Sequence, residues 1–146
     1  MLHLDRAAYD ALLEHARDAA PEEACGLLIG TKETETEPQA RSEEPGVDEI
    51  RRMRNVAPNP EITYELDPEE QYQAMEAIER EGQELVGFYH SHPGGPDGPS
   101  TTDHAKATWV GYHYLIVSLG GERPTVDAWV WTGEQFARDD VVVESI

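Results

Sequence analysis

Residues 85–93 read LVGFYHSHP, an apolar run followed by two histidines and a proline. The apolar run predicts a central strand, and Pro93 ends its pairing because proline has no N–H to donate. Side chains alternate along a strand, so His90 and His92 point to the same side of the backbone. The pair therefore predicts two nitrogen ligands for one metal ion at the C-terminal end of this strand.

A third metal ligand is predicted beyond a loop rich in glycine and proline. Residues 94–99 read GGPDGP, and Ser100 and Asp103 follow. An Asp103 oxygen beside two imidazoles would give zinc three protein ligands and leave the fourth tetrahedral position open, as a hydrolytic zinc site requires. The set of His90, His92 and Asp103 therefore predicts a zinc hydrolase.

The segment from Ser100 to Asp103 also fits a structural role. A serine followed three residues later by an acidic residue is typical of a helix start, where each side chain caps the backbone of the other. The two roles of Asp103, cap and ligand, are geometrically compatible but need the same carboxylate. The sequence leaves both open, and the histidine pair favours the ligand.

Hydrolysis of an amide bond needs two further groups. A carboxylate that does not bind the metal usually takes a proton from the attacking water and passes one to the leaving amine. Glu22 and Glu23 are the candidates, because they directly precede an apolar run at 24–30 that predicts a buried strand. A hydroxyl next to the metal stabilises the developing oxyanion, and Ser100 is placed for that role.

Length and charge limit the kinds of protein that this chain can form. Its 146 residues predict one domain over 1–146, long enough to bury a core without disulfides. The 30 Asp and Glu residues against 11 Lys and Arg residues give a formal net charge of -19, which repels phosphate backbones and anionic bilayers. We therefore expect neither nucleic acid nor a membrane as a partner.

The basic residues are few, and nearly all of them are arginines. Only Lys32 and Lys106 are lysines. A strongly acidic surface suits a protein that is kept soluble at high salt, where ions screen the repulsion between like charges. The composition favours a halophilic origin as a hypothesis.

Cys25 is the only cysteine, which excludes an internal disulfide and any metal site built on several thiolates. The metal ligands must therefore be nitrogen and oxygen atoms. Cys25 itself is expected to be a small buried hydrophobic residue, because no base is indicated beside it. The N-terminal residues lack the apolar run of a signal peptide, so we expect a cytoplasmic protein.

Periodicity and turn residues predict a mixed order of helices and strands. Helices are expected over 4–20, 68–80 and 100–109. Strands are expected over 24–30, 50–57, 62–66, 85–89, 112–119, 125–131 and 141–143, with a hairpin around residues 120–124. Residues 31–48 show neither period and are expected to be a solvated loop. The sum predicts an α/β fold of the mixed α+β kind, with one mixed central sheet flanked by helices.

These motifs together resemble a known family. The run EACGLL begins at Glu23, HSHP follows at 90–93, and Ser100 and Asp103 complete the spacing His-x-His-x7-Ser-x2-Asp. This is similar to the signature of the JAMM or MPN+ zinc metalloproteases, which combine that motif with a distant glutamate.

The resemblance extends beyond the signature. Residues 55–60, NVAPNP, with Tyr64 and the DPE at 67–69, look like the segment that small family members carry between the two halves of the site. The similarity covers roughly residues 4–131.

The resemblance implies an MPN-like domain with cytidine-deaminase-like layering, and it implies a role for each site residue. His90, His92 and Asp103 would bind one Zn²⁺ ion. Glu23, rather than the glutamate before it, would be the general acid/base, and Ser100 would stabilise the oxyanion. Inactive relatives lose metal ligands, whereas this chain keeps them all, which favours an enzyme.

Members of this family act on ubiquitin or on ubiquitin-like proteins. This compact acidic chain looks most similar to the archaeal enzymes that detach small ubiquitin-like modifier proteins from lysines, the desampylase type. That implies hydrolysis of the amide bond after the C-terminal Gly-Gly of such a modifier. Three alternatives stay open: a peptidase that trims sulfur-carrier proteins, a non-catalytic MPN assembly module, and a zinc deaminase, whose thiolate pair has no counterpart here. The oligomeric state is also left open.

Overall fold

The computed structural model describes residues 1–31 and 45–144. This part of the chain contains both helices and strands, as expected of an α/β fold. In chain order the elements are β1 (Leu2–Leu4), α1 (Arg6–Ala19), β2 (Cys25–Thr31), β3 (Gly46–Val47), β4 (Glu49–Met53), α2 (Pro68–Arg80), β5 (Gln83–His92), α3 (Thr101–Lys106), β6 (His113–Ser118), β7 (Thr125–Trp131), β8 (Phe136–Asp139) and β9 (Val141–Val143).

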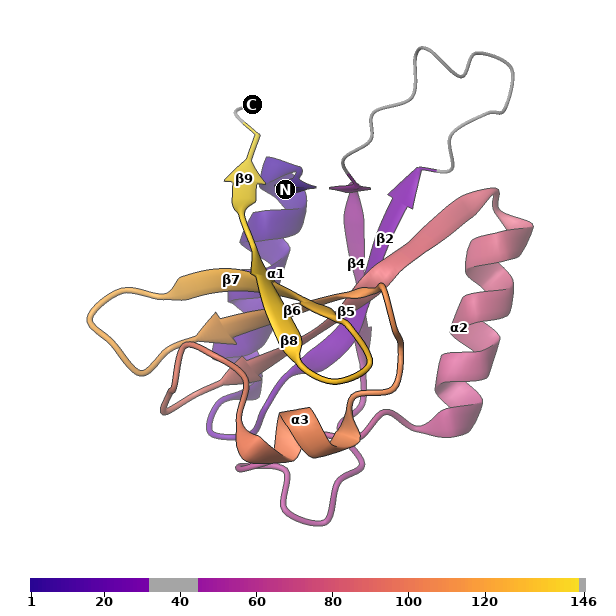
Figure 1. Ribbon diagram of the computed structural model, residues 1–146. Coiled ribbons are helices and arrows are strands. Elements are labelled where there is room, and N and C mark those ends of the chain that lie inside the picture. Colours follow the sequence, from indigo (N-terminus) through magenta and orange to yellow (C-terminus); the bar gives the residue numbers. More distant parts are fainter. Residues whose placement is uncertain (32–44, 145–146) are drawn as a thin grey trace.

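The main sheet is mixed and contains six strands in the order β4-β2-β5-β6-β7-β8 (Figure 1). Strands β5 and β6 are parallel, and the other neighbouring pairs are antiparallel. Strand β5 lies between β2 and β6, so His90 has Cys25 and Ile116 as its neighbours across the sheet. A second, parallel sheet of three strands in the order β3-β1-β9 packs on the same core, because Leu2, Leu4 and Val47 lie in one buried cluster with Leu28 of β2.

Helices α1 and α2 cover opposite faces of the main sheet (Figure 1). Leu12 of α1 belongs to the same buried cluster as Tyr89, whereas Ile78 of α2 belongs to the cluster that contains Phe88. Side chains alternate along β5, so both histidines lie on the Phe88 face of the strand. The end of this face, beyond the α2 core, is where the candidate site lies.

The predicted second helix and the predicted hairpin are confirmed, and the strand predicted over 85–89 extends over Gln83–His92. Helix α2 spans Pro68–Arg80, and the Asp67 side chain accepts the N–H of Glu69 at 3.1 Å as its N-cap. The predicted hairpin is formed by β6 and β7, which are antiparallel. The mixed sheet flanked by helices agrees with the predicted fold class.

The predicted strand over 62–66 is wrong. The Asn59 carbonyl accepts the N–H groups of both Ile62 and Thr63, which closes a turn instead. Ile62 is 72% exposed, whereas Tyr64 and Leu66 pack against the cluster that contains Phe88. The pairing that remains is a single bridge between Asn55 and Leu66.

Several other boundaries differ from the predictions. Leu4 belongs to β1 rather than to the first helix, the strand after residue 48 ends at Met53, and α3 ends at Lys106. Strands β1 and β8 were not predicted, because each is short and its hydrogen-bond partners are distant in the sequence or lie across a turn. Residues 46–47 form β3 within the predicted loop, and residues 32–44 of that loop lie outside the described residues.

Gly87 lies where β5 passes closest to β6. A Cβ atom at this position would clash with the backbone carbonyl oxygen of His113. We expect Gly87→Ala to lower the free energy of unfolding by about 1–3 kcal/mol, because the two strands must move apart. Equilibrium urea unfolding measures this. The control is Gly94→Ala, whose added methyl group meets nothing within 4 Å. Equal stability of the two variants contradicts the prediction.

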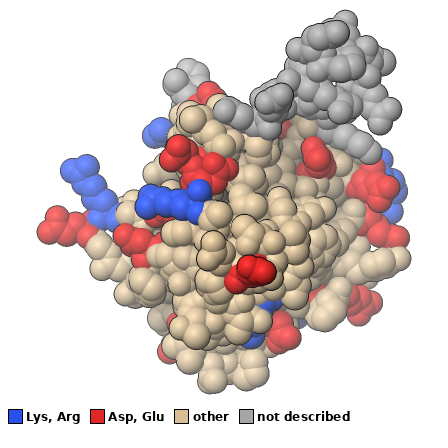
Figure 2. Space-filling model, viewed as in Figure 1, with Lys and Arg blue, Asp and Glu red and all other residues tan. Residues whose placement is uncertain are grey.

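The surface carries many more acidic than basic side chains. Figure 2 shows acidic side chains spread over the visible face, with basic ones at a few places among them. No helix among the described residues is both long enough and apolar enough to cross a membrane.

Candidate metal centre

Three side-chain atoms that the sequence predicts as metal ligands converge beyond the end of β5. His90 Nε2 and His92 Nε2 each lie 3.0 Å from Asp103 Oδ2. All three residues are buried. Strand β5 supplies both imidazoles from one face, and α3 supplies the carboxylate. The structure therefore brings together residues that are separated by a loop in the sequence.

Asp103 also caps α3, so the two roles that the sequence left open occur together. Ser100 Oγ accepts the Asp103 N–H at 3.0 Å, and Asp103 Oδ2 accepts the Ser100 N–H at 2.9 Å. Burial alone would raise the pKa of Asp103, but hydrogen bonds from His90 and His92 outweigh it and hold the pKa well below its usual range. The carboxylate is therefore ionised, as a metal ligand must be.

The backbone fixes the tautomer of His92. Its Nδ1 lies 2.8 Å from the Pro96 carbonyl oxygen, which can only accept, so Nδ1 carries a proton. Desolvation lowers the pKa of His92, but the hydrogen bonds to Asp103 and Pro96 outweigh it and raise the pKa overall. This geometry favours a positive charge between His92 Nε2 and Asp103. Either a second proton on the His92 ring or a metal ion can supply it.

His90 is oriented by a ring contact. Its ring stacks on Tyr64, with 4.3 Å between the ring centroids and 20° between the planes. Its Nδ1 is buried and has no hydrogen-bond partner in the described part of the chain. Desolvation lowers the pKa of His90, which favours the neutral imidazole. Metal-binding histidines usually bind an acceptor through the second nitrogen, and here the Tyr64 ring holds the imidazole instead.

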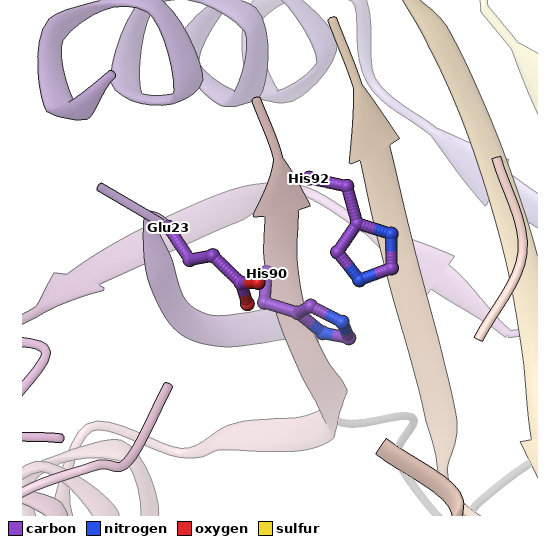
Figure 3. Close-up of side chains that lie close together, drawn as sticks. All are labelled: Glu23, His90 and His92. Carbon is purple, nitrogen blue, oxygen red and sulfur yellow. The ribbon is translucent and has the colours of Figure 1, made fainter. Parts of the chain in front are cut away.

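Glu23 lies beside the histidines although it is far from them in the sequence. Possible ligand atoms of Glu23, His90 and His92 all lie within 4.8 Å of one another, and Figure 3 shows the Glu23 carboxylate directed toward the His90 ring. The side chain is buried, and no described residue forms a hydrogen bond with Oε1. Glu22, the other candidate, is exposed.

Burial makes the Glu23 carboxyl group a weaker acid than usual. It raises the pKa of Glu23 from 4.5 to about 7, against an opposing effect of His92. A carboxyl group with a pKa near neutrality can both accept and return a proton at neutral pH. The environment of Glu23 therefore suits general acid/base catalysis.

Ser100 combines a structural contact with a free donor function. In the helix cap its hydroxyl oxygen accepts a backbone N–H, so the hydroxyl hydrogen can still be donated. The cap holds Ser100 next to Asp103, at the edge of the site. A hydroxyl in this position can donate to an oxygen that becomes negative during a reaction.

The donor atoms fit a divalent metal ion. Bonds of about 2.0–2.2 Å in a tetrahedral site place neighbouring donor atoms roughly 3.3–3.6 Å apart. The observed separations of 3.0 Å between Asp103 Oδ2 and the two Nε2 atoms are close to this. A metal ion bound by His90, His92 and Asp103 would supply the positive charge that the contact needs, with the buried Glu23 Oε1 beside it.

The site includes a residue that no local sequence signal places there. Tyr64 follows the turn at 59–63, and nothing in its neighbours along the chain indicates that its ring reaches His90. Tyr64 also lines a pocket of about 440 Å³ next to the site, whose apolar walls include Leu66, Phe88 and Trp109. This pocket adjoins the metal centre through the Tyr64 ring.

Comparison with known proteins agrees with this geometry. Residues 5–132 match the family model described as prokaryotic homologs of the JAB domain. The chain is 42% identical to the desampylase of Haloferax volcanii, over 98% of this chain and 96% of the relative. It is 33% identical to the probable TtuB-protein conjugate cleaving protease of Thermus thermophilus, over 84% of this chain and 74% of the relative.

Solved structures share the fold. A solution structure of a protein from Desulfitobacterium hafniense has a TM-score of 0.85 and is 27% identical, covering 100% of this chain and 94% of the other. A JAB1/MPN domain protein from Archaeoglobus fulgidus has a TM-score of 0.61 at 21% identity, covering 99% of this chain and 98% of the other. The family model covers most of the chain and two curated relatives exceed 30% identity, so the chain belongs to the prokaryotic JAB-domain family, the JAMM/MPN proteins.

Proposed function

We propose that the chain is a zinc-dependent isopeptidase that hydrolyses the amide bond between the C-terminal Gly-Gly of a ubiquitin-like modifier protein and a lysine. The observation that carries the proposal is the convergence of His90, His92 and Asp103, with the buried Glu23 carboxylate beside them. Three ligands and a separate base are what metal-assisted amide hydrolysis needs.

Zinc is the metal that best suits the donor set. Two imidazoles and one carboxylate are a ligand set typical of catalytic zinc, whereas calcium and magnesium prefer six or more oxygen ligands. When bound, zinc supplies a Lewis acid and lowers the pKa of a water molecule to about 7. His90, His92 and Asp103 would hold it.

The protein's own groups divide the remaining chemistry. The Glu23 carboxylate takes a proton from the attacking water and returns it to the nitrogen of the departing lysine. The Ser100 hydroxyl donates a hydrogen bond to the oxygen of the scissile carbonyl as negative charge develops there. The Pro96 carbonyl holds the His92 ring in its orientation throughout.

The burial of the site supports a slender substrate. Glu23, His90, His92 and Asp103 are each between 1% and 7% exposed. A Gly-Gly tail has no side chains to exclude it from such a site, and an extended tail can also form backbone hydrogen bonds. The relatives named desampylase and TtuB-protein conjugate cleaving protease support a ubiquitin-like conjugate as the substrate class.

The direct test is cleavage of a defined conjugate. Zinc-loaded protein is incubated with a ubiquitin-like modifier joined to a lysine side chain, with and without a chelator. The masses of the products are then measured by mass spectrometry. We expect release of a modifier that ends in Gly-Gly, loss of cleavage with the chelator, and recovery on adding zinc. Failure of the zinc-loaded protein to cleave such conjugates refutes the proposal.

A second candidate is a peptidase that trims C-terminal extensions from a sulfur-carrier protein. The CysO-cysteine peptidase of Mycobacterium tuberculosis, 35% identical over 75% of this chain and 67% of the relative, supports it. Matched substrates with the same modifier, one lysine-branched and one with a linear extension, separate the two. Cleavage of the linear substrate alone favours the second candidate. A non-catalytic assembly module predicts cleavage of neither.

We propose further that residues 1–146 act as one catalytic domain in the cytoplasm. The family match over 5–132 and the cores on both faces of the same sheet support the single domain.

The acidic surface is proposed to reflect adaptation of an archaeal protein to high salt. We expect the thermal midpoint of unfolding to rise between about 0.1 M and 1 M KCl, because the Debye length falls from about 10 Å to about 3 Å and screens the net charge of -19. Calorimetry measures the midpoint, with sucrose at matched osmolality as the control for solvent exclusion. A midpoint that stays constant in KCl, or rises equally in sucrose, contradicts the proposal.

A further inference from the structure

The backbone on both sides of the Glu23 side chain is fixed by contacts from elsewhere in the fold. The Glu23 N–H donates to the Pro60 carbonyl at 2.7 Å, and the Glu23 carbonyl accepts from Asn55 Nδ2 at 3.1 Å. The Ala24 N–H donates to Ser91 Oγ at 2.7 Å, and the Ala24 carbonyl accepts the Ser91 N–H at 3.0 Å. All four backbone polar groups of these two residues therefore have partners.

Asn55 makes one of these four contacts and connects the Glu23 segment to the turn at 59–63. Its side-chain amide group donates, at 3.1, 3.3 and 3.0 Å, to the carbonyls of Glu23, Pro60 and Thr63. Its side-chain oxygen accepts, at 3.0 and 3.1 Å, the N–H groups of Ala57 and Glu65. A carboxamide has both donors and an acceptor, so a carboxylate of the same shape cannot make the first set of bonds.

The same side chain also fixes the ring that orients a histidine. Asn55 binds the carbonyl of Thr63 and the N–H of Glu65, the residues on either side of Tyr64. The Tyr64 ring stacks on His90, and the described residues offer the His90 Nδ1 no hydrogen bond. One half-buried asparagine is therefore connected through short contacts to both the Glu23 segment and a metal-ligand imidazole.

We propose that Asn55 is a positioning residue for catalysis, which holds the Glu23 carboxylate and the Tyr64 ring in the arrangement that the reaction needs. The inference rests on the proposed function of Glu23 and His90. Asn55 acts through the backbone and touches none of the reacting atoms. Positions of this kind matter because small displacements of a catalytic group lower the rate steeply.

The test is Asn55→Asp, which keeps the shape and the oxygen acceptor but removes the donors to Glu23, Pro60 and Thr63. We expect kcat on the lysine conjugate at saturating zinc to fall about 10- to 100-fold, with KM unchanged, as for other residues that orient catalytic groups. The matched control is Asn59→Asp, the same change at an exposed position in the same loop, which should leave kcat unchanged.

A second measurement does not depend on activity. Amide hydrogen exchange in the metal-free proteins reports how firmly the Glu23 segment is held. Asn55→Asp should accelerate exchange of the Glu23 N–H, which bonds the Pro60 carbonyl, and Asn59→Asp should not. Unchanged exchange at Glu23 overturns the inference.

The outcomes separate this inference from the proposed function. If the wild-type protein cleaves the conjugate and Asn55→Asp keeps its kcat, the positioning role is wrong and the isopeptidase remains. If the wild-type protein cleaves nothing, the proposed function is wrong and the catalytic role of Asn55 is wrong with it. Near-UV circular dichroism checks that the variant is folded. Should it not fold, Asn55→Ser, which keeps one hydroxyl donor, is expected to show the same loss of kcat and faster exchange, and wild-type values for it overturn the inference.

Discussion

Asp103→Ala is expected to abolish metal binding and cleavage together. Asp103 Oδ2 lies 3.0 Å from both Nε2 atoms and also accepts the Ser100 N–H, so its removal takes away the one carboxylate oxygen that both imidazoles contact. Loss of groups that merely orient ligands lowers metal affinity about 10- to 100-fold, and loss of a ligand should exceed that. Zinc content after dialysis and calorimetric titration measure the affinity.

The change should also destabilise the protein. The substitution removes the acceptor of the Ser100 N–H, one of the two hydrogen bonds of the capping box, and lowers the free energy of unfolding by about 1 kcal/mol. The control is Asp97→Ala, which removes an exposed aspartate from the same loop with no contact to the imidazoles. If Asp103→Ala binds zinc as tightly as Asp97→Ala does, Asp103 is a helix cap and no ligand.

Glu23→Gln is expected to lower kcat by about 10²- to 10⁴-fold while the protein keeps its zinc. The amide has nearly the same shape but cannot take up a proton, and general acid/base groups contribute rate enhancements of this size. Zinc content and steady-state kinetics on the lysine conjugate separate the two effects. The matched control is Glu22→Gln, the same change at the exposed neighbour, which should retain activity. Loss of zinc from Glu23→Gln would instead make Glu23 a ligand.

The same substitution should show what the buried carboxylate does to stability. Burial raises the pKa of Glu23 from its ordinary value of 4.5 to about 7, so the folded protein disfavours the charged form. The contribution of Glu23 to the stability of the metal-free protein should therefore decrease as the pH rises from about 4.5 through 7, and the difference in stability between the wild type and Glu23→Gln reports it. Glu23→Gln has no charge to bury, so at pH values above this range it should be at least as stable as the wild type. A metal-free Glu23→Gln protein that is less stable at high pH contradicts this account.

The two halves of the candidate site were unequally accessible to sequence reasoning. His90 and His92 are two residues apart in a strand, and Asp103 follows Ser100 at the spacing of a capping box, so local geometry alone aligns each pair. Helix α2 was predicted with its correct ends for the same reason, because its cap and first proline are local signals. Local periodicity and capping signals thus determined the strand, the starts of α2 and α3, and three of the residues in the site.

Contacts between residues that are distant in the sequence could be identified only from the tertiary structure. Two adjacent glutamates offered no local basis for a choice, and the turn between α1 and β2 directs only Glu23 toward the histidines. Asn55 and Tyr64 lie on either side of the turn at 59–63, in the segments that were predicted as two strands, and their contacts with Glu23 and His90 depend on how these segments pack.

The sequence by itself therefore determined that this protein has a mixed α/β fold and a strand end with two imidazoles near a capped aspartate. The tertiary structure decided which carboxylate joins them, that the Pro96 carbonyl holds His92 and the Tyr64 ring holds His90, and that Asn55 connects the base to the Tyr64 ring. The physical reason is that backbone periodicity and capping act over a few residues, whereas burial and hydrogen bonds between distant segments exist only once the sheet has formed. Burial on that sheet is also what raises the pKa of Glu23 to about 7 and makes it suited to proton transfer.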